Sequence, residues 1–235
     1  MTPSRPQPSA LALHDAKFGY EPARGPVLHI GSLDAAVGER LFLFGPSGCG
    51  KTTLLGLLTG ILQADSGVVE VLGRDLTPLS PAERDSLRAS HVGYVFQLFN
   101  LIPYLTVREN IALPCRVSRT RRRRLGVDSP EEAADELARR LGIADLLVRP
   151  AAELSVGQQQ RVAAARALIG SPELVFADEP TSSLDAASRD RFLELLLGGC
   201  DRDCTVVFVS HDHGLAALFD RAISLPEANR AVPHG

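Results

Sequence analysis

Leu41-Phe42-Leu43-Phe44-Gly45-Pro46-Ser47-Gly48-Cys49-Gly50-Lys51-Thr52-Thr53 is the stretch of sequence that decides the fold. Its opening apolar run is typical of a strand buried on both faces of a parallel sheet. The remainder contains the pattern G-x-x-x-x-G-K-[ST], whose glycines let backbone N–H groups turn inward around a phosphate. A helix is expected from Thr52 to Leu62, and its N-terminal dipole favours the same negative charge. The stretch therefore predicts a strand, a phosphate-binding loop and a helix in succession.

Two side chains of the loop have separate predicted roles. Lys51 would neutralise charge on the β- and γ-phosphates, and the Thr52 hydroxyl would hold Mg²⁺. The residues expected to bind the nucleotide here are Gly45, Pro46, Ser47, Gly48, Cys49, Gly50, Lys51, Thr52 and Thr53.

Strands and helices alternate along much of the remaining chain, which predicts an α/β core with a parallel sheet. Expected strands are 11–18, 27–33, 35–37, 41–44, 68–72, 91–96, 174–177 and 205–209. Expected helices are 52–62, one beginning at Ser80, 131–141, 156–169 and 186–197. Residues 98–159 have few β-branched runs and are expected to form a mostly helical insertion. A length of 235 residues suits one large α/β domain or two small ones.

Composition narrows the class of function. The formal charge of −3 argues against bulk nucleic-acid binding. No apolar run approaches the roughly 18 residues that a membrane-spanning helix needs, so none is expected.

A second apolar strand, Leu174-Val175-Phe176-Ala177, ends in two carboxylates. Asp178 at the strand end would position Mg²⁺ through water, and Glu179 would polarise an attacking water as a general base. An exposed acidic turn before Pro180 is the alternative interpretation, and the phosphate-binding loop upstream makes it the weaker one. His211 follows the strand 205–209, where a neutral imidazole can bond a γ-phosphate; a surface histidine is the alternative.

The pentapeptide Leu154-Ser155-Val156-Gly157-Gln158, placed between these motifs, resembles the signature of the ATP-binding cassette (ABC) family. In that family two copies of the chain sandwich ATP between them, head to tail. Ser155 and the Gly157 N–H lie at an expected helix start, which is an anion site. Because the chain has its own phosphate loop, this second site is expected to contact the partner's γ-phosphate. Val156 replaces the family's usual glycine but retains the backbone N–H.

The resemblance implies further roles and a fold. Gln97 would reach Mg²⁺ and the attacking water, His211 would be the switch histidine, and Tyr20 would stack on adenine. Ser183-Leu184-Asp185 would be the D-loop at the dimer seam. The residues expected to bind nucleotide outside the phosphate loop are Tyr20, Ser155, Gly157, Gln158 and Asp185.

The implied fold is a P-loop (RecA-like) α/β core with an edge antiparallel β-subdomain and an inserted helical subdomain. The expected organisation is a single domain, 10–226, between tails at 1–9 and 227–235. Its core would span about 10–97 and 160–226, and the helical subdomain about 98–159.

A narrower likeness, to the ATPases of lipoprotein-release and macrolide-export systems (LolD/MacB type), rests on three segments. They are 95–103, 105–114 and 155–162. The likeness implies an integral-membrane permease docked near Gln97 to Pro103, and a peripheral position on the cytoplasmic face of the membrane. ATP and Mg²⁺ are the expected cofactors, and no nucleic acid is expected.

Other members of the family remain alternatives. An amino-acid importer ATPase shares part of the Gln97 segment, and a cell-division regulator would signal through a transporter-like membrane protein. A soluble ABC ATPase acting on DNA or ribosomes usually carries coiled coils, zinc modules or tandem cassettes, and none is visible here. The arginine run 119–124 is interpreted as a solvated loop balanced by acidic residues after it; contact with anionic lipid is the alternative.

Overall fold

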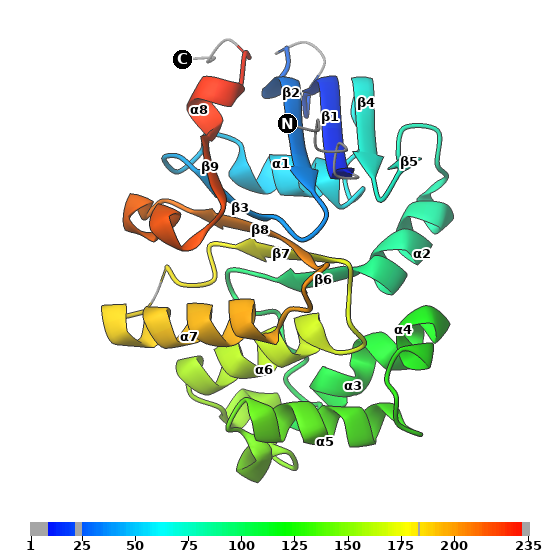
Figure 1. The fold of residues 1–235 in the computed structure, drawn as a ribbon, viewed down its shortest axis with the longest axis vertical. Helices are drawn as coiled ribbons and strands as arrows, with labels where there is room; N and C mark the ends of the chain where they lie inside the picture. The colour runs from blue at the N-terminus through cyan, green and yellow to red at the C-terminus, as the bar shows by residue number, and fades with distance from the viewer. Residues whose placement is uncertain (1–8, 22–24, 183, 232–235) are drawn as a thin grey trace, which may run out of the picture. The chain divides into compact units, whose positions relative to one another are not determined.

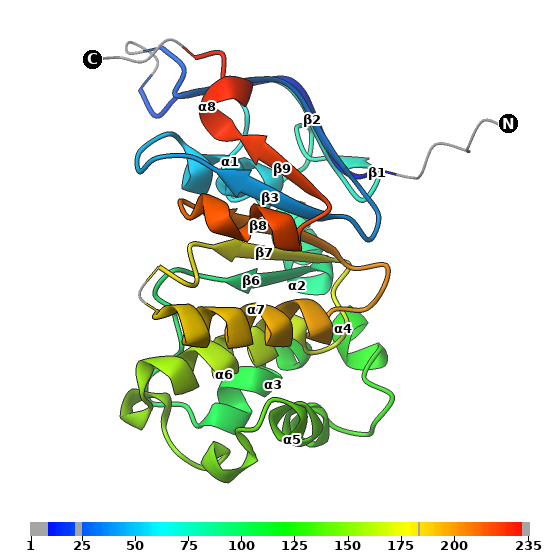
Figure 2. The same ribbon diagram turned by 60° about the vertical axis from the view of Figure 1, so that its left-hand side comes forward.

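The structure is a computed structural model that describes residues 9–21, 25–182 and 184–231. Its contacts divide the chain into two compact units, residues 1–85 with 207–235 and residues 86–206. Residues 1–8 and 232–235 of the expected tails, and Ser183 of the expected D-loop, lie outside the described residues. Figures 1 and 2 show the elements of each unit.

An antiparallel sheet in the first unit has the strand order β2-β1-β4-β5. Its strands are β1 (Ser9–Phe18), β2 (Leu28–Ala36), β4 (Ser66–Val71) and β5 (Arg74–Asp75). The expected break between two short strands at Asp34 is wrong. Asp34 pairs with Ala12 and is exposed, so it continues the alternation of buried and exposed residues along one strand.

The apolar run before the phosphate loop forms β3 (Arg40–Phe44), which pairs in parallel with β9 (Arg221–Ser224). The strand β8 (Thr205–Ser210) is its other neighbour. Leu41, Phe42 and Leu43 are completely buried, as a strand covered on both faces must be. This part of the prediction is confirmed, and it fixes where the loop after Phe44 begins.

The helix after the loop, α1 (Lys51–Leu58), is shorter than expected. Gly60 has φ 66°, and its N–H donates to the Leu57 carbonyl at 2.9 Å. Because glycine enters the left-handed region without a Cβ clash, it ends the helix before Leu62. Short elements complete the unit: η4 (His213–Leu218) and α8 (Leu225–Ala228).

In the second unit, β6 (Val92–Val95) and β7 (Leu174–Asp178) pair in parallel, with Val95 opposite Ala177. All residues of β7 are buried. The helix α2 (Pro81–His91) leads into β6. Gly93 of β6 lies so close to α6 that a Cβ there would be 2.3 Å from the Ala167 carbonyl oxygen. Only glycine permits this approach of strand and helix.

Helices make up most of the second unit, as expected for its central segment. They are α3 (Val107–Val117), α4 (Arg119–Arg123), α5 (Pro130–Arg140), η2 (Ala144–Leu146), η3 (Ala151–Glu153), α6 (Val156–Leu168) and α7 (Ala186–Gly199). Both α5 and α6 contact α3 (Figures 1 and 2). In the part of the chain that the structure describes, no helix has the length and apolarity to cross a membrane. Parallel strand pairs, helices and an antiparallel sheet together confirm the α/β class.

Candidate functional site

The phosphate-binding loop runs from the end of β3 to the start of α1, as the motif predicts. Gly48 and Gly50 have φ values of 81° and 100°, which other residues adopt only with strain. A Cβ on Gly50 would also lie 2.8 Å from Leu28 Cδ2, whereas the Cβ side of Gly48 is open. A ligand can therefore approach the loop backbone closely at Gly48, where no other atom occupies the space.

Lys51 folds back over this loop. Its side chain is buried, and Nζ donates to the carbonyl oxygens of Gly45 at 2.7 Å and Pro46 at 2.9 Å. The ammonium group thus already lies against the loop that would hold phosphate. Thr52, in the first turn of α1, is exposed, so its hydroxyl can reach a metal ion, while Thr53 is buried.

Tyr20 lies near the same helix. Its hydroxyl is 3.1 Å from Thr53 Oγ1, and its ring packs edge-on against Phe18 with centroids 4.9 Å apart. With 62% of the residue exposed, the ring retains surface on which a base could stack. The structure therefore places Tyr20 beside Thr53, the last residue of the phosphate-loop motif.

His211 follows the fully buried strand β8 and is exposed. The nearby His213 is in ring contact with Phe44, the last residue of β3, at 4.3 Å between centroids. The end of β8 therefore lies close to the start of the phosphate loop within the first unit. His211, the residue directly after β8, lies at this same end of the strand.

Asp178 and Glu179 lie in the second unit, where β7 ends. Asp178 is buried as the last residue of the strand, and Glu179 has φ 47°. A non-glycine residue in this region costs roughly 1–3 kcal/mol, and such strain clusters at functional sites. Gln160 of α6 donates to the Pro180 carbonyl oxygen at 3.1 Å and so supports the turn from behind. Gln160 was not predicted from the sequence to have a role at this turn.

Gln97 is the second residue after β6 and is exposed. Because β6 and β7 are parallel neighbours, Gln97 and Asp178 lie at the same carboxyl edge of the pair. The two residues after Leu98 have unusual backbones, with φ 59° at Phe99 and 47° at Asn100. Arg166 of α6 donates to both of their carbonyl oxygens, at 2.5 Å and 2.7 Å respectively. Nothing in the local sequence indicates this contact.

The pentapeptide forms the start of α6. Ser155 is the N-cap: its Oγ accepts from Gln158 N at 3.4 Å, and the Gln158 side chain accepts from Ser155 N at 2.9 Å. Val156 is half exposed and is not among the positive-φ residues, so the valine fits a helical first turn. No atom lies within 4 Å of the Cβ direction of Gly157. This face of the helix start is open to a ligand, while the Gln158 side chain is engaged in the cap.

Asp185 is the N-cap of α7 and accepts from Ser188 N at 2.9 Å. Hydrogen bonding from Ser188 lowers the pKa of its carboxyl group below the ordinary value. Asp185 is therefore an ionised carboxylate that caps the N-terminus of α7. Just before Asp185, Leu184 N donates a hydrogen bond to the Thr181 carbonyl oxygen at 3.2 Å, which closes a turn.

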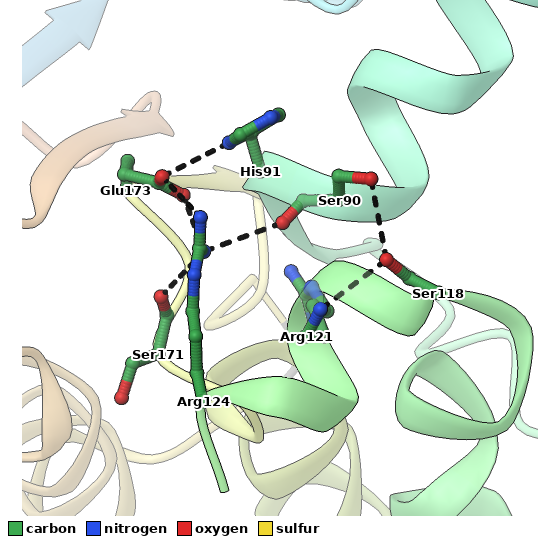
Figure 3. A network of polar contacts seen from close by, with 7 residues as sticks. All are labelled: Ser90, His91, Ser118, Arg121, Arg124, Ser171 and Glu173. Atoms are coloured by element: carbon green, nitrogen blue, oxygen red, sulfur yellow. Dashed lines mark hydrogen bonds and ion pairs between the residues drawn. The ribbon is translucent and has the colours of Figure 1, made fainter.

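The arginine run 119–124 is a helix and not a loop, and it is solvated only in part, since Arg119, Arg122 and Arg123 are exposed. It forms α4, in which Arg121 is 1% exposed and donates to the Ile169 carbonyl oxygen at 3.1 Å. Arg124 makes a two-pronged contact with Glu173 and reaches the Ser171 carbonyl (Figure 3). Two acidic residues after the run pair with other arginines, Glu131 with Arg116 and Asp135 with Arg108. Arg121 and Arg124 therefore attach the helix to the segment that leads from α6 to β7.

Three comparisons place this architecture among known proteins. The family model described as ABC transporter matches residues 28–182. The chain is 42% identical over 194 residues to an uncharacterized ABC transporter ATP-binding protein of Mycobacterium tuberculosis, covering 83% of this chain and 57% of that protein. It is also 42% identical over 191 residues to the uncharacterized ABC transporter ATP-binding protein YbbA of Escherichia coli K12, covering 80% and 81%. The match thus spans less than two thirds of the mycobacterial relative's length.

Two solved structures share the fold. One is the dimeric structure of MJ0796, described as a bacterial ABC transporter cassette, and the other is a dimeric post-hydrolysis state of MJ0796 bound to ADP and Pi. Each has a TM-score of 0.76 and 32% sequence identity, covering 91% of this chain and 93% of the other. The predicted P-loop fold is thereby confirmed.

Proposed function

The chain belongs to the ABC transporter family as an ATP-binding cassette, and from this premise we propose that it hydrolyses ATP to drive a membrane partner. The observation that carries the proposal is the pairing of two phosphate-binding features in one chain. A glycine loop follows β3, and a separate open helix start lies at Ser155 and Gly157. One chain needs only the first to hold its own phosphates, so the second serves another chain.

Nucleotide binding uses the first unit. The loop's backbone N–H groups and Lys51 receive the phosphates, and Tyr20 stacks on the adenine. Lys51 now bonds the carbonyl oxygens of Gly45 and Pro46, so phosphate oxygens would offer the same ammonium group stronger acceptors.

The expected metal donors are the Thr52 hydroxyl, the Gln97 amide and the Asp178 carboxylate. All three offer oxygen, which Mg²⁺ prefers, so the donor chemistry fits this ion. Bound Mg²⁺ would supply neutralisation of charge on the β- and γ-phosphates.

We assign hydrolysis to Glu179, Gln97 and His211 of one chain, together with two features of a partner copy. Glu179 orients and polarises the attacking water, and the Gln97 amide helps to position it. His211 donates a hydrogen bond to the γ-phosphate. The partner copy adds its Ser155 hydroxyl and the N-terminal dipole of its α6, so that two copies complete each centre. The dimeric state described for the MJ0796 cassette supports this arrangement.

We place the membrane partner near Gln97 to Pro103. Leu98 within this segment and Tyr104 directly after it are 82% and 81% exposed, so two large apolar side chains are available to a partner there. A pocket of about 260 Å³ lies close by, and residues such as Tyr94, Phe96 and Val117 line it. An apolar segment of a permease suits this surface.

We propose that the membrane partner is a permease of the lipoprotein-release or macrolide-export type. The support is the likeness of segments 95–103, 105–114 and 155–162 to the ATPases of those systems. The protein would then act at the cytoplasmic face of the membrane. Isolation of the chain with its native membrane partner tests this assignment. Recovery of a permease supports it, whereas recovery with DNA or ribosomes would overturn it in favour of a soluble ABC ATPase.

The variant Glu179→Gln tests the hydrolytic assignment. It keeps the size and hydrogen-bonding capacity of the side chain but removes its basicity. ATP binding is expected to remain near the wild-type level, while turnover falls by a factor of about 10² or more. Glu194→Gln, an exposed site on α7, is the matched control. Normal turnover by Glu179→Gln would refute the role.

A further inference from the structure

We propose that Arg166 is a positioning residue that fixes the Gln97 loop to the far end of the helix that begins at Ser155. The inference rests on the proposed roles of Gln97 and Ser155. It adds that Arg166 keeps the Gln97 loop in a fixed position relative to the helix that carries Ser155. The contact itself is a property of the second unit, so it can be tested apart from those roles.

The contact is a two-pronged clamp. Arg166 Nη2 donates to the Phe99 carbonyl oxygen at 2.5 Å, and Nη1 donates to the Asn100 carbonyl oxygen at 2.7 Å. A guanidinium group is planar and holds its donors in a fixed fork, so it can fix two successive carbonyl groups at once. Burial lowers the pKa of Arg166 to about 10, so the group stays protonated at neutral pH.

The clamped segment is a strained turn. Phe99 and Asn100 are adjacent non-glycine residues that both have left-handed backbones. Their N–H groups are used within the turn, by the Phe96 carbonyl at 2.9 Å and the Leu98 carbonyl at 2.6 Å. The Phe99 side chain is buried and adds an apolar anchor to the turn. Because two such conformations in succession are unfavourable, the turn needs an external partner, and Arg166 supplies it.

The helix α6 links this turn to the remaining candidate groups of the second unit. Ser155 caps its start and Arg166 lies in its last turn, about 16 Å away at 1.5 Å per residue. Between them, Gln160 donates to the Pro180 carbonyl, one residue beyond Glu179. A single helix therefore contacts both the Gln97 loop and the Glu179 turn and carries Ser155 at its tip.

Arg166 also faces the surface proposed for the membrane partner. It lines the 260 Å³ pocket together with Phe96 and Tyr94. An occupant of that pocket would lie against the side chain that clamps the loop. Displacement of Arg166 would then shift Gln97 relative to α6, which gives the partner a route to the hydrolytic groups.

The test compares Arg166→Met and Arg166→Lys in the full chain. Methionine keeps the unbranched stem but removes every donor, whereas lysine keeps the charge without the fork. Arg140→Met, at an exposed site in α5, is the matched control. Hydrogen exchange of the amides of residues 99 and 100 measures the clamp, and kcat and KM for ATP measure its consequence.

For Arg166→Met we expect faster exchange confined to the 98–101 turn, and a kcat lowered about tenfold with KM changed less than about threefold. Arg166→Lys should fall between this variant and the wild type. Unchanged exchange in both variants would overturn the clamp, even if ATP were not the substrate. Faster exchange with unchanged kcat would overturn the positioning role. If Arg166→Met does not fold, the lysine variant decides both points by the same criteria. Absence of ATP turnover in the wild type would instead refute the proposed function.

Discussion

The hydroxyl group of Tyr20 lies 3.1 Å from Oγ1 of Thr53, so the ring proposed to stack on adenine is tethered to the helix that follows the phosphate loop. Loss of the ring and loss of the tether should therefore have different effects. Tyr20→Ala should weaken ATP binding by about 1–3 kcal/mol, the usual contribution of base stacking, which is roughly 5- to 150-fold in Kd. Calorimetric titration with ATP measures this change.

Tyr20→Phe keeps the ring and loses only one partly buried hydrogen bond. Its Kd should rise by less than about tenfold, in line with the modest net contribution of such bonds. If Tyr20→Ala bound ATP as tightly as the wild type, the stacking role would be wrong.

Gly93→Ala should destabilise the second unit. The new methyl group would lie 2.3 Å from the Ala167 carbonyl oxygen, and backbone atoms cannot rotate away as a side chain can. Overpacking of this kind costs about 1–3 kcal/mol, which urea unfolding would detect. Gly198→Ala is the control, because nothing lies within 4 Å of its Cβ direction and alanine favours its helix. Equal stability of the two variants would contradict the close packing of β6 on α6.

Arg121→Met should leave the free energy of unfolding unchanged or raise it. Arg121 is buried, and its Nε and Nη2 atoms have no hydrogen-bond partner among the described residues. Burial also lowers its pKa to about 10, which reflects an unfavourable charged state. Replacing such a cation by an apolar chain of similar length is often neutral or stabilising by about 1–4 kcal/mol. A loss of more than about 3 kcal/mol in chemical unfolding would show that the buried charge is needed.

Arg124→Met should lower the free energy of unfolding, and the size of this loss should depend on pH. Burial raises the pKa of Glu173, but hydrogen bonds from Arg124 and His91 outweigh it, and the net pKa lies below the ordinary value of 4.5. The folded protein therefore binds this proton less readily than the unfolded chain. Stability from the Glu173 contacts is present above about pH 4.5 and is lost as pH falls through the folded pKa.

The difference in unfolding free energy between wild type and Arg124→Met should thus be largest near neutral pH, at about 1–3 kcal/mol, and should narrow in acid. Unfolding by urea at several pH values measures it. A difference that stayed constant from pH 7 to about pH 3 would contradict the assignment of the pair.

Local patterns predicted much of the fold. The apolar runs at 41–44, 174–177 and 205–209 became buried strands, because each is too apolar to face water. The ends of helices were predicted less accurately, because they depend on single turn residues. Gly60, for example, has a left-handed backbone that ends α1 before Leu62. The continuous strand β2 was missed because Asp34 looks like a break in sequence, although it simply faces outward.

Contacts between distant residues could not be predicted. The partners of Arg166 lie 66 and 67 residues away in sequence, and Glu173 lies 49 residues from Arg124. A run of arginines looks solvated until the fold supplies a carboxylate and carbonyl groups around it. The strained backbone of Glu179 is likewise a product of tertiary structure, because nothing in its local sequence requires a left-handed residue.

The central claim is that two chains complete each hydrolytic centre, and complementation between two defective variants tests it most directly. Lys51→Ala removes the phosphate-loop cation. Ser155→Asp keeps a good helix cap but places a negative charge where the partner's γ-phosphate would bind. Alone, each variant forms dimers in which every centre carries one defect, so ATP turnover should be nearly lost.

A mixed dimer concentrates both defects in one centre and leaves the other intact. An equimolar mixture should therefore recover about a quarter of wild-type turnover, since half of the dimers are mixed and each has one working centre. The account predicts this recovery. Turnover in the mixture that equals the mean of the two separate variants would contradict it.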